Sequence, residues 1–106
     1  MSGGNIVKKL MAAQAALGKV QKEIEESEFT GSSQGGLVVV NITGKGIVKS
    51  TTIDSTVLTE DAETVATLVT GAMNNAVEKK DAFSKERLKS VKGALVPTGL
   101  KIPGLG

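Results

Sequence analysis

Apolar residues near the start of the chain recur at helical spacing. They occupy positions 6, 10, 13, 17, 20 and 24, at alternating intervals of four and three residues. This alternation is typical of a heptad seam and predicts a helix over about residues 5–28, with Asn5 as its N-cap. The periodicity fits two surroundings equally well, because such a helix can lie on the sheet of its own chain or pack against a partner helix.

The pattern then changes to that of strands. Leu37–Thr43 is rich in β-branched residues and predicts a strand, and residues 47–54 predict the next one. Gly44-Lys45-Gly46 between them supplies the residues that a tight hairpin requires. Residues 29–33 are a candidate short edge strand, so the segment over about residues 29–54 predicts a three-stranded antiparallel meander.

A second helical pattern is predicted over about residues 59–92. Thr59 is a candidate N-cap, acidic residues follow it in the first turn, and Gly93 is a candidate end. The remaining segment, 93–106, contains two prolines and is expected to be an extended, flexible tail. Residues 1–106 therefore form a single domain of the α+β class, in the order α-β-β-β-α.

This order leaves apolar surface without a partner. A small three-stranded sheet cannot cover the apolar faces of two helices that are each longer than the sheet. A second copy of the chain is the simplest way to bury the surplus, so a homodimer is expected.

Composition narrows the possible chemistry. The 106 residues include no Cys and no His, and only 2% are aromatic. The missing Cys and His exclude thiol nucleophiles and imidazole ligands, and the low aromatic content argues against base-stacking platforms. Gly44-Lys45-Gly46 does not fit a phosphate-binding loop and is interpreted as a turn, while Asp54 is interpreted mainly as a turn-capping residue. We therefore expect no enzymatic activity, no cofactor, no metal and no small-molecule substrate.

The sequence shows no segment that targets a membrane. No apolar run approaches the ~20 residues of a transmembrane helix, and the first residues resemble neither a secretory nor a transit signal. The expected location is the cytoplasm.

The net charge of +2 conceals a strong segregation of charge. Residues 1–22 carry four lysines and no acid, and residues 79–101 carry seven basic and two acidic residues. Residues 23–63 carry eight acids and two lysines. Such a pattern can describe ordinary solvated helix faces, or two basic regions that bind a polyanion and are doubled in a dimer.

Several short elements follow one another in a characteristic order. They are Thr30-Gly31, the segment from Gly36 to Gly44, Ile53-Asp54 with Leu58, residues 68–76, and the tail from Pro97 to Pro103. With this ordered set the chain resembles the YbaB/EbfC family of bacterial nucleoid-associated DNA-binding proteins. The chain departs from the usual family pattern at Ser55, where proline is common, and at Asn75, where aspartate is common.

The resemblance implies a tweezer-like homodimer that binds double-stranded DNA with limited sequence specificity in the nucleoid. It also implies a role in nucleoid organisation and gene regulation. Our candidate phosphate-binding residues are Lys8, Lys9, Lys79, Lys80, Lys85, Arg87, Lys89 and Lys92. The alternative is a dimeric protein-interaction adaptor that does not bind DNA.

Overall fold

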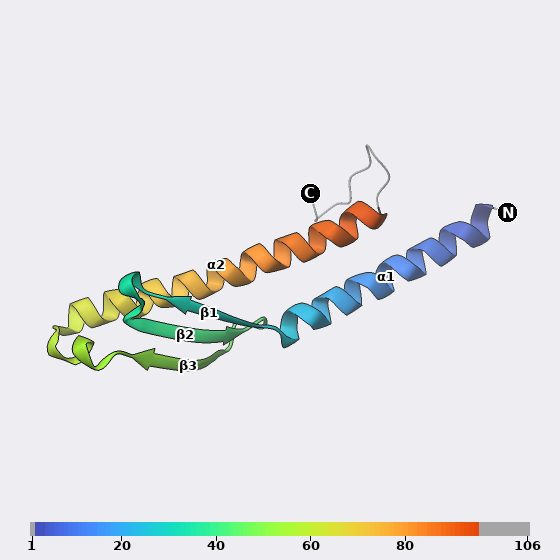
Figure 1. Cartoon of the computed structure of the whole chain (residues 1–106). Helices are drawn as coiled ribbons and strands as arrows, with labels where there is room; N and C mark the ends of the chain where they lie inside the picture. The colour runs from blue at the N-terminus through green and yellow to red at the C-terminus, as the bar shows by residue number, and fades with distance from the viewer. Residues whose placement is uncertain (1, 96–106) are drawn as a thin grey trace.

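The computed structural model describes the backbone of residues 2–95 and the side chains of residues 5–91. Its elements are α1 (Ser2–Glu26), β1 (Glu28–Ser32), η1 (Gln34–Gly36), β2 (Val38–Thr43), β3 (Val48–Ile53), η2 (Ser55–Thr59) and α2 (Ala62–Leu95). The predicted α-β-β-β-α order is therefore confirmed (Figure 1).

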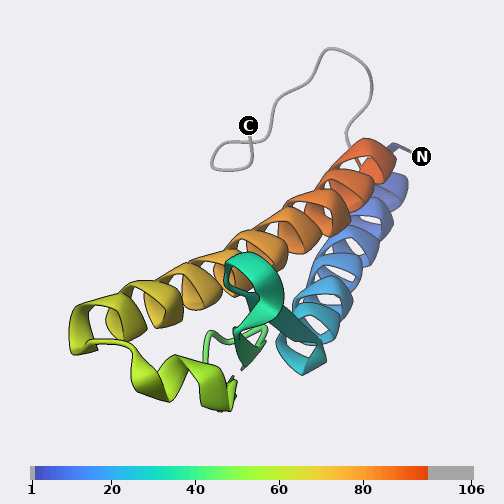
Figure 2. The ribbon, with the colours of Figure 1, turned by 60° about the vertical axis from the view of Figure 1, so that its left-hand side comes forward.

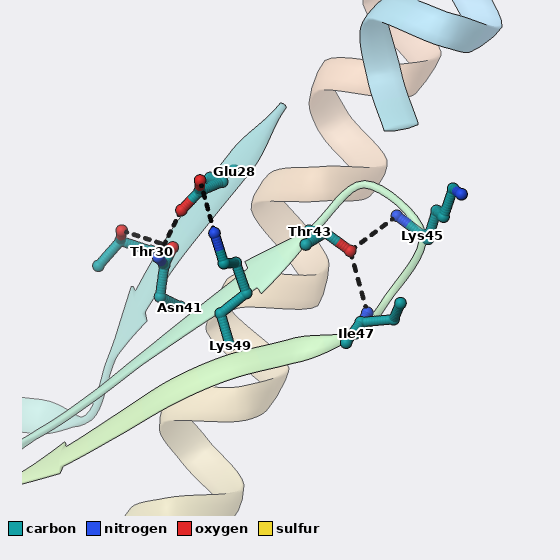
Figure 3. Close-up of polar contacts among 7 residues, drawn as sticks. All are labelled: Glu28, Thr30, Asn41, Thr43, Lys45, Ile47 and Lys49. Atoms are coloured by element: carbon teal, nitrogen blue, oxygen red, sulfur yellow. Dashed lines mark hydrogen bonds and ion pairs between the residues drawn. The ribbon is translucent and has the colours of Figure 1, made fainter. Parts of the chain in front are cut away.

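The three strands form one antiparallel sheet in the order β1-β2-β3. The hairpin between β2 and β3 is closed by Gly46, whose φ of 84° lies in the region that favours glycine. At the same tip, Thr43 Oγ1 accepts hydrogen bonds from the backbone N–H groups of Lys45 and Ile47, both at 3.2 Å (Figure 3). The hairpin predicted at Gly44-Lys45-Gly46 is confirmed.

Helix α2 packs across one face of β1 and β2. Alternate β2 residues Val38, Val40 and Ile42 are buried against Ala72 and Ala76 of α2. The small alanine side chains let the helix come close to the sheet, and at Gly31 of β1 no side chain fits at all. A Cβ atom at Gly31 would collide with the backbone of α2 at Ala72 and Ala76.

Strand β3 lies outside the cover of α2. Register pairs Ile53 with Val38 and Val48 with Ile42, so these β3 residues share the apolar face of the sheet. Every residue of β3 is nevertheless exposed, including Ile53 at 38% and Val48 at 43%. The core therefore lies between α2 and the two strands β1 and β2. The third strand, β3, extends the apolar face of the sheet, but α2 does not cover it.

Helix α1 lies beyond the end of the sheet and packs against α2. Val20 and Ile24 of α1 are buried with Val91 of α2, and Phe83 of α2 joins this cluster to the core under the sheet. The two helices run side by side in opposite directions (Figures 1 and 2). The sequence left two alternatives for this helix, and the prediction that it lies on the sheet of its own chain is wrong. Its C-terminal half packs against a helix, and that helix is α2 of the same chain.

The ends of α2 differ from the predicted ones. Thr59 belongs to η2, and the helix starts after Asp61, whose carboxylate accepts a hydrogen bond from the N–H of Thr64 at 2.9 Å. Helix α2 also continues through Gly93 to Leu95. An N-cap side chain accepts a hydrogen bond from an N–H group two or three residues later, and Asp61 fills this role for α2 instead of Thr59. The predicted tail beyond residue 95 lies outside the described residues.

The chain is long and thin, with principal extents of 71 × 24 × 17 Å. The sheet occupies one end, and the α1–α2 pair forms the other (Figure 1). Within residues 2–95, no helix combines the length and hydropathy that crossing a bilayer requires.

Candidate nucleic-acid interface

Among the described side chains, one ion pair links α1 to α2. The guanidinium of Arg87 lies 2.8 Å from the carboxylate of Glu23, with the two side chains 39% and 43% exposed. The Nε atom of Arg87 is buried and has no hydrogen-bond partner among the described residues. Arg87 was predicted to bind phosphate, but the structure places it between the two helices, where its charge is matched by Glu23.

Lys85 and Lys89 are the clearest candidates for phosphate contact. Both are exposed, and their spacing of four residues places them on one side of α2, one turn apart. No described acidic side chain forms an ion pair with either of them. They present two adjacent positive charges to the solvent.

Lysines of α1 extend this charge along the helix pair. Lys8 and Lys9 are exposed in the N-terminal half of α1. The sequence-based selection missed Lys19 and Lys22, which are also exposed on α1. Their spacing from Lys8 is the signal that could have found them, because intervals of 11 and 14 residues return to nearly the same side of a helix.

Two predicted phosphate-binding residues instead contact the sheet. Lys79 donates a hydrogen bond to the backbone carbonyl of Thr30 at 2.9 Å. Lys80 is half-buried, and its Nζ atom lies next to Gly46 at the tip of the β2–β3 hairpin. The last predicted residue, Lys92, lies on α2, but its side chain is outside the described residues.

Six exposed lysines thus lie on the helix pair, and we call them the basic arm. They are Lys8, Lys9, Lys19 and Lys22 on α1, and Lys85 and Lys89 on α2. Since α1 and α2 are antiparallel and Glu23 meets Arg87, Lys19 and Lys22 lie level with the lysines of α2. Lys8 and Lys9 lie farther out, by about 16 Å for the 11 residues between Lys8 and Lys19.

Acidic side chains are engaged in structural roles at the sheet. Glu28 accepts hydrogen bonds from Asn41 at 2.7 Å and from Lys49 at 3.2 Å on the polar face of the sheet (Figure 3). These contacts lower the pKa of Glu28, with the Asn41 bond as the largest cause. Asp54 caps η2 by accepting from the hydroxyl of Thr56 at 2.7 Å and from its N–H at 2.9 Å, which lowers the pKa of Asp54. The predicted turn-capping role of Asp54 is confirmed.

Comparisons with known proteins agree with this architecture. A family model described as the YbaB/EbfC DNA-binding family matches residues 1–95. The crystal structure of the uncharacterized protein HP0035 from Helicobacter pylori resembles this chain with a TM-score of 0.64 and 22% sequence identity. The match covers 91% of this chain and 99% of that one. At this identity the likeness shows a common fold.

Proposed function

Because this chain belongs to the YbaB/EbfC DNA-binding family, we propose that it grips duplex DNA through the phosphate backbone, using the basic arm. Such contacts carry no sequence information, so the expected binding has low sequence specificity. In the cell this activity would serve nucleoid organisation and gene regulation.

One observation carries the proposal. The lysines of the basic arm are exposed on two helices that lie side by side, and residues 5–22 of α1 carry four lysines and no acid. Of the eight acids of residues 23–63, Glu23, Glu25 and Glu26 lie on the last turn of α1, and the other five lie in β1 or between β3 and the first turn of α2. The part of α1 before Glu23 therefore carries positive charge only, and it extends away from the sheet (Figure 1).

Salt dependence of binding tests the proposal. The measurement is titration of random-sequence duplex DNA with the purified protein at several salt concentrations. The double variant Lys85→Gln/Lys89→Gln should weaken binding and reduce the slope of log K against log salt by about 0.9 for each phosphate that is no longer neutralised. Lys79→Gln should change this slope much less, because Lys79 is hydrogen-bonded to Thr30.

Lys49→Gln is the matched control, since Lys49 lies on β3 outside the basic arm and its charge is paired with Glu28. An unchanged slope in the double variant would reject the assignment of these two residues. Absence of any salt-dependent DNA binding by the unmodified protein would favour the adaptor alternative.

We further propose that the functional unit is a homodimer formed around β3. The uncovered apolar face of β3 continues onto one flank of α2, where Met73 and Val77 are 39% and 43% exposed. Leu58, in the turn after β3, is 74% exposed. A second copy placed against this surface would cover the strand that α2 leaves open, and it would double the number of basic arms.

Sedimentation velocity tests the dimer. The unmodified protein should sediment as a dimer at micromolar concentration, and Val77→Asp should shift it toward the monomer because a buried charge is costly at an apolar interface. Ala82→Asp introduces the same charge at an exposed position near the middle of α2 and should leave the dimer intact. A monomeric unmodified protein would refute this part of the proposal.

A further inference from the structure

An apolar patch lies exposed on the N-terminal half of α1. It consists of Ile6, Val7, Leu10 and Met11, which are 55–65% exposed. Burial rises steadily along the same seam, through half-buried Leu17 to buried Val20 and Ile24. The patch is therefore the uncovered continuation of the α1–α2 contact surface.

The described part of α2, which extends to Leu95, is too short to reach the patch. Arg87 meets Glu23, and the eight residues from Arg87 to Leu95 carry α2 about 12 Å farther at the usual helical rise. The same distance along antiparallel α1 leads from Glu23 back to Ala15. Helix α1 accordingly continues past the last turn of α2 (Figure 1).

The chain itself continues from this point with eleven more residues, 96–106. This segment contains four apolar residues, Val96, Leu100, Ile102 and Leu105, and two prolines, Pro97 and Pro103. Proline cannot continue the hydrogen bonding of a helix and favours an extended path in the residue before it. In an extended path Leu100 and Ile102 point to the same side.

We propose that residues 96–106 fold back over α1 of the same chain and cover this apolar patch. From Ala13 to Ile6 the surface is about 10 Å long at the helical rise, and an extended segment needs only a few residues of about 3.3 Å each to follow it. The segment would extend the α1–α2 interface where α2 has ended. Lys8 is about 200° around the helix from Leu10 at about 100° per residue, nearly opposite the patch, so it stays free in this arrangement.

Disulfide trapping tests the contact directly, because the chain contains no cysteine of its own. The variant Leu10→Cys/Leu100→Cys is oxidised mildly and examined on a non-reducing gel and by peptide mass analysis. The expected product is a disulfide within one chain. The control Lys8→Cys/Leu100→Cys carries the first cysteine on the opposite side of the same turn and should form this bond at least about tenfold more slowly.

Three outcomes would overturn the proposal. Equal rates in the two variants would mean that the segment has no preferred docking face. A covalent dimer between chains carrying only Leu10→Cys and chains carrying only Leu100→Cys would assign the segment to a second copy. A covalent dimer of the Leu10→Cys chain with itself would show that two copies of α1 cover each other.

Hydrogen exchange provides a readout that does not need cysteines. In the full-length variant Leu100→Ser/Ile102→Ser, backbone amides of residues 7–12 should exchange about tenfold faster than in the unmodified protein, because the covering side chains are removed. Thr98→Ser is the control and should leave these rates unchanged. Unchanged exchange in the double variant would also refute the proposal, provided that amides of residues 38–42 show the fold to be intact.

Discussion

Two glycines of similar appearance in the sequence have opposite surroundings in the fold. Gly31 lies where β1 touches the backbone of α2, so it determines how closely helix and sheet approach. Gly18 lies in the middle of α1, and a Cβ built there has nothing within 4 Å. The first glycine is required by packing, whereas the second only loosens its helix.

Substitution by alanine should separate these two roles. Gly31→Ala should lower the free energy of unfolding by at least about 2 kcal/mol, because the added methyl meets backbone that cannot rotate away. Gly18→Ala should raise it by about 0.5–1 kcal/mol, because alanine favours the helix. Urea denaturation of both variants measures the two changes, and a stable Gly31→Ala protein would contradict the close approach.

Hydrogen-bonded carboxylates should make the fold sensitive to acid. The pKa values of Asp54 and Asp61 are lowered in the folded chain, each mainly by a hydrogen bond to a threonine. The two carboxylates therefore stabilise the fold fully at a pH above the pKa that an aspartate has in the unfolded chain, about 4. This stabilisation is lost as the pH falls through the lower pKa that each group has in the folded chain. The thermal unfolding temperature should fall over that interval.

Asp54→Asn isolates one of these groups. Asparagine can still accept hydrogen bonds from Thr56 but carries no charge. The variant should be less stable than the unmodified protein at neutral pH, and the two unfolding temperatures should converge in acid. A difference that persists unchanged in strong acid, about two pH units below the usual aspartate pKa of about 4, would show that the charge of Asp54 does not contribute in this way.

At the scale of elements, the local sequence was sufficient to predict the strands and helices. It was not sufficient to predict which of these elements pack against each other. The alternation of β2 and the glycines of the hairpin determine local backbone geometry, so the meander was predictable. The seam of α1 specifies an apolar face but not what covers it, because a sheet and a helix both accept such a face. That α2 passes over β1 and continues to α1 depends on contacts at Gly31 and Phe83, far apart in sequence.

The candidate site was predictable to a similar extent. The sequence analysis selected Lys85 and Lys89 on the second predicted helix, and the structure leaves both exposed. The sequence could not show that Lys79 would bond to Thr30 or that Arg87 would pair with Glu23, since the partners are separated by 49 and 64 residues. The neighbours of a basic residue in the sequence therefore do not show which partner its side chain has in the folded chain.

Removing a buried side chain should detach α1 locally. Ile24 is only 5% exposed and anchors α1 against α2, so Ile24→Ala should cost about 2–4 kcal/mol. Ile47→Ala removes the same atoms at 59% exposure and should change stability by less than about 0.5 kcal/mol. Denaturation gives the totals, and faster hydrogen exchange in α1 of the first variant would locate the effect.

The whole molecule is far from spherical. Its radius of gyration is 19.6 Å, whereas a compact chain of this length has about 13 Å. The difference arises because the helix pair extends beyond the sheet. The extended pair has a long surface, whose shape suits a rod-like ligand such as the duplex DNA of the proposed function. Under the proposed function, an elongated shape would place several lysines along one duplex without a high net charge.

The two edges of the sheet differ in a way that limits assembly. Along β1, Asn75 of α2 accepts a hydrogen bond from the backbone N–H of Ser32 at 3.0 Å, and Lys79 donates to the carbonyl of Thr30. These side chains occupy backbone groups that another strand would need. The β3 edge has no such cover among the described residues. Only the β3 edge is therefore open to pairing with a strand of another chain. If two chains paired through their β3 edges, neither would have an open edge left, so strand pairing would stop at two chains and could not build a fibre.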